Sequence, residues 1–144
     1  MRIAKLFGAL AIIQIVLALF DREPVDLHVH ATYFVIGRTY LLIAFATISV
    51  SLALIYLATS RWLRPLKDSL GFTHFALTTL GFLLLWLSLF VIRFLSTNDL
   101  AQPITNSLPR LAIVLGLFFF AAGAIAFVAN CVWTAFTMFR WHRS

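Results

Sequence analysis

Four long apolar runs dominate this chain and restrict it to one kind of solvent. They cover residues 3–20, 32–59, 70–95 and 110–138, and most charged residues gather in the segments between them. A run of about 20 apolar residues crosses the hydrocarbon layer of a bilayer as a helix, and a helix satisfies its backbone polar groups internally. We therefore predict an all-α integral membrane protein, in which residues 1–144 form a single four-helix membrane domain.

The composition agrees with a lipid environment. Hydrophobic residues make up 62% of the chain and charged residues 11%, whereas soluble domains carry about 25% charged residues. The net charge of +6 could indicate a nucleic-acid partner, but the basic residues lie at the ends of the apolar runs, as they do in membrane helices. We expect the lipid bilayer, and no nucleic acid, as the partner of this surface. The single cysteine, Cys131, excludes a disulfide framework within one chain.

The first run has two interpretations. It begins after Arg2 and with Lys5 near its start, and a basic start before an apolar run is also typical of a secretory signal peptide. The run is long for a signal peptide, and no small-residue cleavage site follows it. We therefore predict a retained first helix that ends before Pro24, because the residue preceding a proline disfavours helical geometry.

The distribution of charge predicts the topology. One side of the membrane receives a strongly basic set, opposed by Asp68: Arg2, Lys5, Arg61, Arg64, Lys67, Arg140 and Arg143. The other side receives a mixed set: Arg22, Arg38, Arg93, Arg110, Asp21, Glu23, Asp26 and Asp99. Because cytoplasmic segments carry the excess of Lys and Arg, both termini are expected in the cytoplasm. The protein is then a multi-pass protein of a bacterial-type cytoplasmic membrane, with the His28/His30 loop on its outer face.

The stretch between the first two runs contains candidate metal ligands. His28 and His30 are two residues apart, close to Asp26 and Tyr33. In an extended backbone such neighbours point the same way, so two imidazoles and a carboxylate could converge on copper or zinc. Two histidines do not complete a tetrahedral site, and the missing ligand would have to come from elsewhere. The alternative is a pair of ordinary surface histidines.

Arg38 lies where the second run should already be entering hydrocarbon. An arginine at that depth needs a partner or must extend toward the headgroups. The partners we considered are Asp26, Asp99 and a lipid phosphate; an ion pair would fix the connection before residue 32 onto the bundle. The residues from Tyr33 to Arg38 are expected to be the outer end of the second helix or to pack at the membrane interface.

Polar residues within the third and fourth runs suggest helix packing. His74, Thr78 and Gly81 follow helical spacing and form one stripe. Small residues and hydroxyl groups allow membrane helices to approach closely and to hydrogen-bond. We favour this structural role over a proton path or a ligand site, and we interpret Asn130 and Thr134 in the same way.

The segment from His30 to Tyr40 resembles a known pattern. It is similar to the start of the tenth helix in subunit I of the haem-copper respiratory oxidases. The matching positions are Asp26, His30, Thr32, Tyr33, Phe34, Val35 and Ile36. His74-Phe75 with Gly81 resembles that family's eleventh helix, and residues 127–134 resemble the end of its twelfth. The four runs thus correspond in order to the last four helices of the family.

The departures from this pattern argue against catalysis. The family's two haem-ligating histidines fall at Arg38 and Tyr40, and the Asp that follows the first His is Ala31. A permanently protonated guanidinium cannot ligate haem iron, and the copper-ligating histidines belong to earlier helices of the family. We therefore lean toward a non-enzyme that acts as a structural, accessory or self-assembling subunit. An electron-transfer or quinol-handling protein would need a chromophoric cofactor, with His74 as the one histidine inside the runs.

The resemblance also implies an assembly. Subunit I of the oxidases resembles three four-helix arcs in a pseudo-threefold ring, so three copies of this chain could form a twelve-helix homotrimer. Symmetric closure is the usual arrangement of homo-oligomers. Docking onto a respiratory membrane complex is the other arrangement considered. No cofactor is certain from the sequence; copper, zinc or haem at the outer histidines, across a subunit interface, remains the alternative function.

Overall fold

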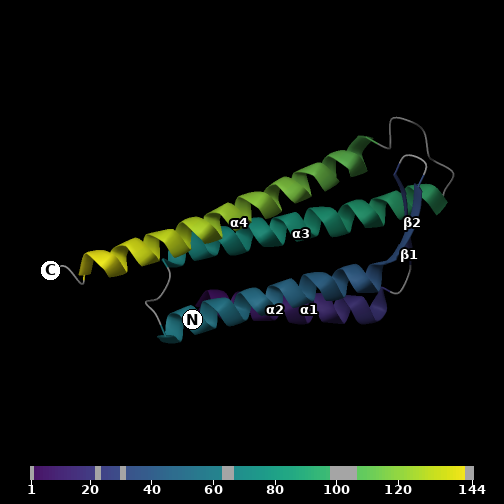
Figure 1. Ribbon diagram of the computed structural model, residues 1–144. Helices are drawn as coiled ribbons and strands as arrows, with labels where there is room; N and C mark the ends of the chain where they lie inside the picture. Colours follow the sequence, from purple (N-terminus) through teal and green to yellow (C-terminus); the bar gives the residue numbers. More distant parts are fainter. Residues whose placement is uncertain (1, 22–23, 30–31, 63–66, 98–106, 142–144) are drawn as a thin grey trace. The chain divides into compact units, whose positions relative to one another are not determined.

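The computed structural model describes residues 2–21, 24–29, 32–62, 67–97 and 107–141. Within these ranges, side chains are described outside residues 22–36, 62–66, 92–107 and 138–144. The elements are α1 (Arg2–Phe20), β1 (Pro24–Val29), β2 (Thr32–Gly37), α2 (Arg38–Trp62), α3 (Asp68–Thr97) and α4 (Ser107–Trp141). Four helices in the described part of the chain are long and apolar enough to cross a membrane (Figure 1). The prediction of four membrane-length helices is therefore confirmed.

The chain divides into two compact units, Met1–Leu57 and Ala58–Ser144. The first unit contains α1, the two strands and most of α2, and the second contains the end of α2 with α3 and α4. Helix-to-helix contacts occur within each unit, between α1 and α2 in the first and between α3 and α4 in the second.

In the first unit α1 and α2 run antiparallel (Figure 1). They meet through aromatic and polar side chains. The rings of Phe7 and Tyr56 stack with their centroids 5.8 Å apart, and Phe7 is fully buried. Two turns further along α1, the Ser49 hydroxyl donates to Gln14 Oε1 over 2.8 Å, and both side chains are buried. A buried polar pair of this kind links two membrane helices without leaving a hydrogen-bonding group facing lipid.

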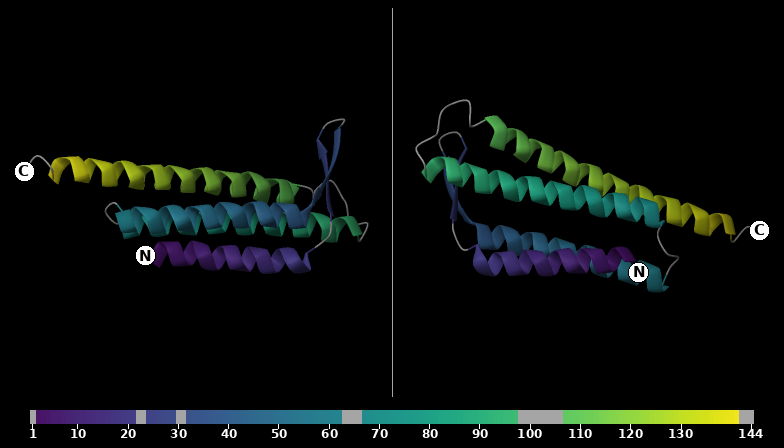
Figure 2. Two further views of the ribbon diagram at one scale, coloured as in Figure 1. Left: turned by 60° about the horizontal axis from the view of Figure 1, so that its bottom comes forward. Right: turned by 180° about the vertical axis from the view of Figure 1, so that it is seen from behind.

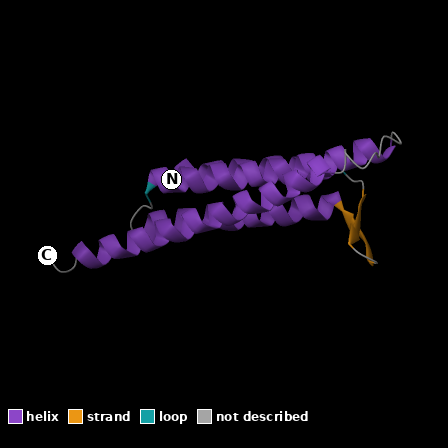
Figure 3. Cartoon of the chain, turned by 90° about the horizontal axis from the view of Figure 1, so that it is seen from above, coloured by secondary structure: helices purple, strands orange, loops and turns teal. Residues whose placement is uncertain are grey.

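A two-stranded antiparallel hairpin connects α1 to α2 (Figure 3). The register pairs Pro24 with Gly37 at one end and Val29 with Thr32 at the other. The prediction that the helix extends outward through Tyr33 is therefore wrong, since Thr32–Gly37 forms a strand and α2 begins only at Arg38. The alternative, packing at the membrane interface, stays a prediction. β-Branched and aromatic residues favour strands, and glycine disfavours a helix interior.

Gly37 is the last residue of β2 and directly precedes α2. A Cβ atom added there would lie 2.9 Å from Cδ2 of Tyr40, so the ring of Tyr40 closes over the glycine backbone. The ring itself faces outward, with Tyr40 75% exposed. The second apolar run therefore consists of a strand that ends at Gly37 and a helix that begins at Arg38.

In the second unit α3 and α4 lie side by side and antiparallel (Figure 2). Their backbones approach closely at three glycines: a Cβ on Gly81 would lie 2.8 Å from the carbonyl oxygen of Gly116. One on Gly123 would lie 2.8 Å from Oγ1 of Thr78. Small residues allow this close approach of the two backbones. Close packing is needed because lipid provides no hydrophobic driving force between helices, so van der Waals contacts must hold them together.

Candidate functional site

The end of α1 and the start of α2 meet in a small polar cluster. Asp21 follows the last residue of α1, and its amide still donates to the carbonyl of Leu17 over 2.8 Å. Its own carbonyl accepts the hydroxyl of Thr39 over 3.0 Å. The last carbonyls of a helix have no partner within that helix, so Thr39 supplies one from the first turn of the next helix.

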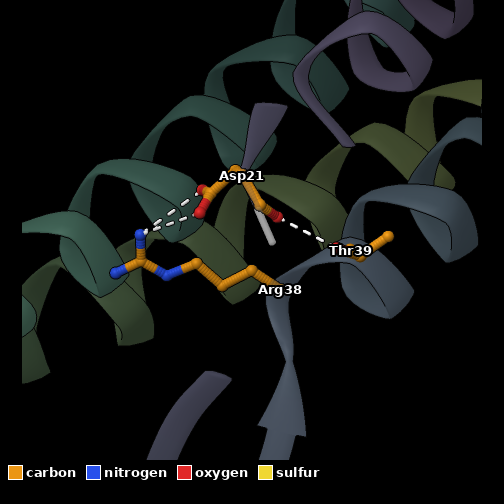
Figure 4. A network of polar contacts seen from close by, with 3 residues as sticks. All are labelled: Asp21, Arg38 and Thr39. Atoms are coloured by element: carbon orange, nitrogen blue, oxygen red, sulfur yellow. Dashed lines mark hydrogen bonds and ion pairs between the residues drawn. The ribbon is translucent and has the colours of Figure 1, made fainter. Parts of the chain in front are cut away.

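The Asp21 carboxylate receives the guanidinium of Arg38. Nη1 of Arg38 donates to both Oδ1 and Oδ2 over 3.3 Å (Figure 4). The side chain of Arg38 is 5% exposed and that of Asp21 is 17% exposed. A cation is favoured at the C-terminus of α1 and disfavoured at the N-terminus of α2, so the carboxylate offsets the poor position of Arg38 in its own helix. We call Asp21, Arg38 and Thr39 the Asp21–Arg38 clamp.

Asp21, the partner of Arg38 in the described part of the chain, was not among the predicted partners. The structure pairs Arg38 with Asp21, whereas the side chain of Asp26 and the residue Asp99 lie outside the described part. The signal was present, because the predicted topology put Asp21 and Arg38 on the same side, each next to an apolar run. The hairpin returns the chain to the end of α1 and brings the two residues together.

The structure describes the backbone of most of the predicted metal-binding stretch. The hairpin register places His28 opposite Tyr33 and Asp26 opposite Val35. His30 lies outside the described residues, and so do the side chains of the other predicted ligands, Asp26 and His28. Elsewhere in the described side chains, no group of three or more His, Cys, Asp or Glu residues could hold a metal ion.

The stripe predicted in the third run lies against α4. His74 is 3% exposed, and its ring centroid lies 5.2 Å from that of Phe127. Thr78, at 5% exposure, and Gly81 continue the same face toward the glycines of α4. The glycines of α4 were missed from the sequence, although glycines on two adjacent apolar runs are a signal for close helix contact.

Asn130 is the most buried polar residue of α4, with no exposed surface. Its Oδ1 accepts the amide of Lys67 over 3.0 Å, and its Nδ2 donates to the Lys67 carbonyl over 3.2 Å. The Thr134 hydroxyl donates to the carbonyl of Asn130 over 2.9 Å. The amide side chain thus attaches the residue before α3 to α4 by two hydrogen bonds.

Four apolar helices with buried polar contacts at their ends define a multi-pass membrane protein. Within that class, the chain is 28% identical over 116 residues to cytochrome c oxidase subunit 1 of Synechocystis sp.. The match covers 78% of this chain and 21% of that protein, so the chain spans about a fifth of its length. No protein-family model matches the chain, and no solved structure matches it. The likeness is to a part of an oxidase subunit I.

Proposed function

We propose that this chain is a non-catalytic membrane protein, similar to part of a haem-copper oxidase subunit I, that acts as a structural or accessory subunit. The observation that carries the proposal is the Asp21–Arg38 clamp. By the resemblance, Arg38 stands where the oxidase pattern has a haem-ligating histidine, and here its guanidinium donates to the carboxylate of Asp21. The position serves to join two helix ends.

By the resemblance, Tyr40 stands where the oxidase pattern has its second haem-ligating histidine. Tyr40 is two residues after Arg38, which is a rotation of about 200° around a helix. Arg38 is buried and Tyr40 is 75% exposed. The two side chains therefore face opposite sides of the helix, as two histidines at this spacing also would, and Tyr40 presents an exposed phenol in place of the second imidazole of the pattern.

We further propose that the chain functions as an assembly, a homotrimer or a subunit docked to a respiratory membrane complex. Many large apolar side chains are exposed along all four helices, so each helix has surface that lipid or another helix must cover. In this arrangement both termini lie in the cytoplasm and the hairpin faces outward, in agreement with the charge distribution.

A second candidate function is an outer-face site for copper, zinc or haem. It is supported by the hairpin, because an extended strand brings residues two apart to the same face, and Asp26 and His28 both lie in β1 opposite β2 residues that include Tyr33. Ligands from another subunit would complete the site together with His30.

Native mass spectrometry of protein released from a gentle detergent tests both functions, because it reports subunit number and bound mass together. A colourless homo-oligomer, or a complex with a respiratory subunit, is the expected result. An isolated monomer without any partner would overturn the accessory role. Stoichiometric metal or haem that disappears in the His28→Ala/His30→Ala variant would establish the second function instead.

A variant that restores both histidines of the oxidase pattern tests whether a haem site remains at the clamp. We expect Arg38→His with Tyr40→His to bind no more haem than the wild-type protein, because Arg38 occupies a helix junction and not a cofactor space. Haem bound by that variant, and not by the wild type, would mean that a haem cavity persists behind the substituted positions. The pyridine-haemochrome spectrum measures the difference.

A further inference from the structure

The backbone of Lys67 is fixed at the start of α3. Its carbonyl accepts the amide of Gly71 over 3.0 Å, the first hydrogen bond of the helix. Its amide and carbonyl also bond to both polar atoms of the Asn130 side chain, at 3.0 and 3.2 Å. Because Asn130 is fully buried against α3, Lys67 is held at a defined point beside α4.

The side chain of Lys67 extends along α4 to an aromatic ring. Its Nζ lies 5.2 Å from the centroid of the Trp133 ring, within the range of a cation–π contact. Trp133 comes three residues after Asn130, about one helical turn further along α4. The contact therefore holds the ammonium at the surface of α4.

This surface faces the surroundings of the unit. Trp133 is 53% exposed, and its neighbours Val132 and Phe136 are 62% and 66% exposed. Lys67 is itself exposed. An ammonium over a tryptophan ring with exposed apolar residues beside it, on a helix long enough to cross a bilayer, matches the boundary between acyl chains and headgroups, where tryptophan is enriched.

The charge of Lys67 is not neutralised by an acidic side chain in the described part of the chain. No ion pair of Lys67 is found among the described side chains. The neighbouring carboxylate of Asp68 lies in the first turn of α3, where it complements the helix dipole. The topology predicted from the charges puts Lys67 on the cytoplasmic side, where the leaflet is anionic.

We propose that Lys67 and Trp133 bind the phosphate headgroup of an anionic phospholipid. The ammonium pairs with the phosphate, the indole N–H donates to the phosphate or to an ester carbonyl, and the acyl chains lie along Val132 and Phe136. The site lies wholly within the second unit and does not depend on the proposed function.

Native mass spectrometry with added lipid tests the site. The wild-type protein in detergent is titrated in parallel with phosphatidylglycerol, phosphatidylethanolamine and inorganic phosphate. We expect saturable adducts with phosphatidylglycerol only, and a loss of about fivefold in affinity for Lys67→Gln, the effect of one cation near an anionic headgroup. Lys67→Arg should retain the affinity, and Trp133→Leu should lower it.

Lys5→Gln is the matched control, since Lys5 is another exposed lysine on the predicted basic side but lies in α1. It should change the affinity less than twofold. Equal losses in Lys67→Gln and Lys5→Gln would overturn the site in favour of diffuse attraction. Equal binding of phosphatidylethanolamine, or binding of inorganic phosphate alone, would overturn the assignment to an anionic lipid. Both Lys67 variants keep the backbone bonds to Asn130, so their helix content should be unchanged.

Discussion

Nη1 of Arg38 lies 3.3 Å from both carboxylate oxygens of Asp21, and the two residues are 17 apart in the chain. The pair closes the loop formed by the hairpin, so that the last residues of one membrane helix hold the first residues of the next. Arg38 is buried at the N-terminus of α2, a position that disfavours a cation. Asp21 therefore compensates a charge that its own helix disfavours.

Removal of one partner of this pair should destabilise the first unit. For Arg38→Leu we expect a loss of about 2 kcal/mol in the free energy of unfolding, the size of a hydrogen bond to a charged group. Unfolding in detergent, titrated with SDS and followed by circular dichroism, measures it. Arg110→Leu, which changes an exposed arginine, should stay within about 0.5 kcal/mol; similar losses for both would contradict a specific pair.

Exchange of the two charges gives a sharper test of the same pair. The double variant D21R/R38D puts a cation at the C-terminus of α1 and an anion at the N-terminus of α2, which suits both helix dipoles. We expect it to recover at least half of the stability lost by either single variant, measured in the same SDS titration. A double variant no more stable than the singles would mean that the geometry of the original pair, and not its charge, holds the helices.

An added methyl group at the contact of α3 and α4 should separate these helices. In Gly81→Ala the new Cβ would lie 2.8 Å from the Gly116 carbonyl oxygen, a backbone atom that cannot rotate away. We expect a loss of about 1–3 kcal/mol from overpacking, seen as a lower melting temperature. Gly8→Ala is the control, because nothing lies within 4 Å of its Cβ position, and better helix propensity should leave it unchanged or more stable.

The helices and the hairpin differ in how well the sequence predicts them. The apolar runs predicted the helices well, with 70–95 and 110–138 against the observed α3 (Asp68–Thr97) and α4 (Ser107–Trp141), because lipid imposes a minimum apolar length. The strand over residues 32–37 was not predicted. An apolar segment rich in β-branched residues is compatible with a strand as well as with a helix, so its sequence alone does not decide between them.

The candidate site could be predicted only in part. The cost of an unpaired charge near hydrocarbon indicated that Arg38 needs a partner. The identity of that partner, Asp21, depends on where the hairpin directs the chain, which is a property of tertiary structure. The same limit applies to Asn130: its polarity predicted an interhelical contact, but its partner, the backbone of Lys67, carries no side-chain signal.

Loss of the Asn130 amide should loosen the start of α3. In Asn130→Leu, which is close in size, the amide and carbonyl of Lys67 both lose a buried partner. We expect the free energy of unfolding to fall by about 2 kcal/mol, about 1 for each bond. Hydrogen exchange should also become faster in the first turn of α3, near Gly71. Unchanged exchange there would show that the two bonds do not hold this end of the helix.

The Gln14–Ser49 bond allows a comparison of two serines in one helix. The Ser49 hydroxyl is buried and reaches α1, whereas the exposed Ser51 hydroxyl donates within α2 to the carbonyl of Thr47. We expect Ser49→Ala to lose about 0.6 kcal/mol, the average for a hydrogen bond between membrane helices, and Ser51→Ala to lose less. The SDS titration compares them directly, and a larger loss for Ser51→Ala would exclude the interhelical bond as a source of stability.

The division of contacts into two units also has a consequence for biogenesis. The bonds of the first unit join near neighbours in the chain, 17 residues apart for Arg38–Asp21 and 35 for Ser49–Gln14. Neither bond needs any residue of α3 or α4. The Lys67–Asn130 bonds span 63 residues and need α4 to be made. The first helix pair can therefore close while later helices are still being synthesised, whereas the second pair has to wait for α4.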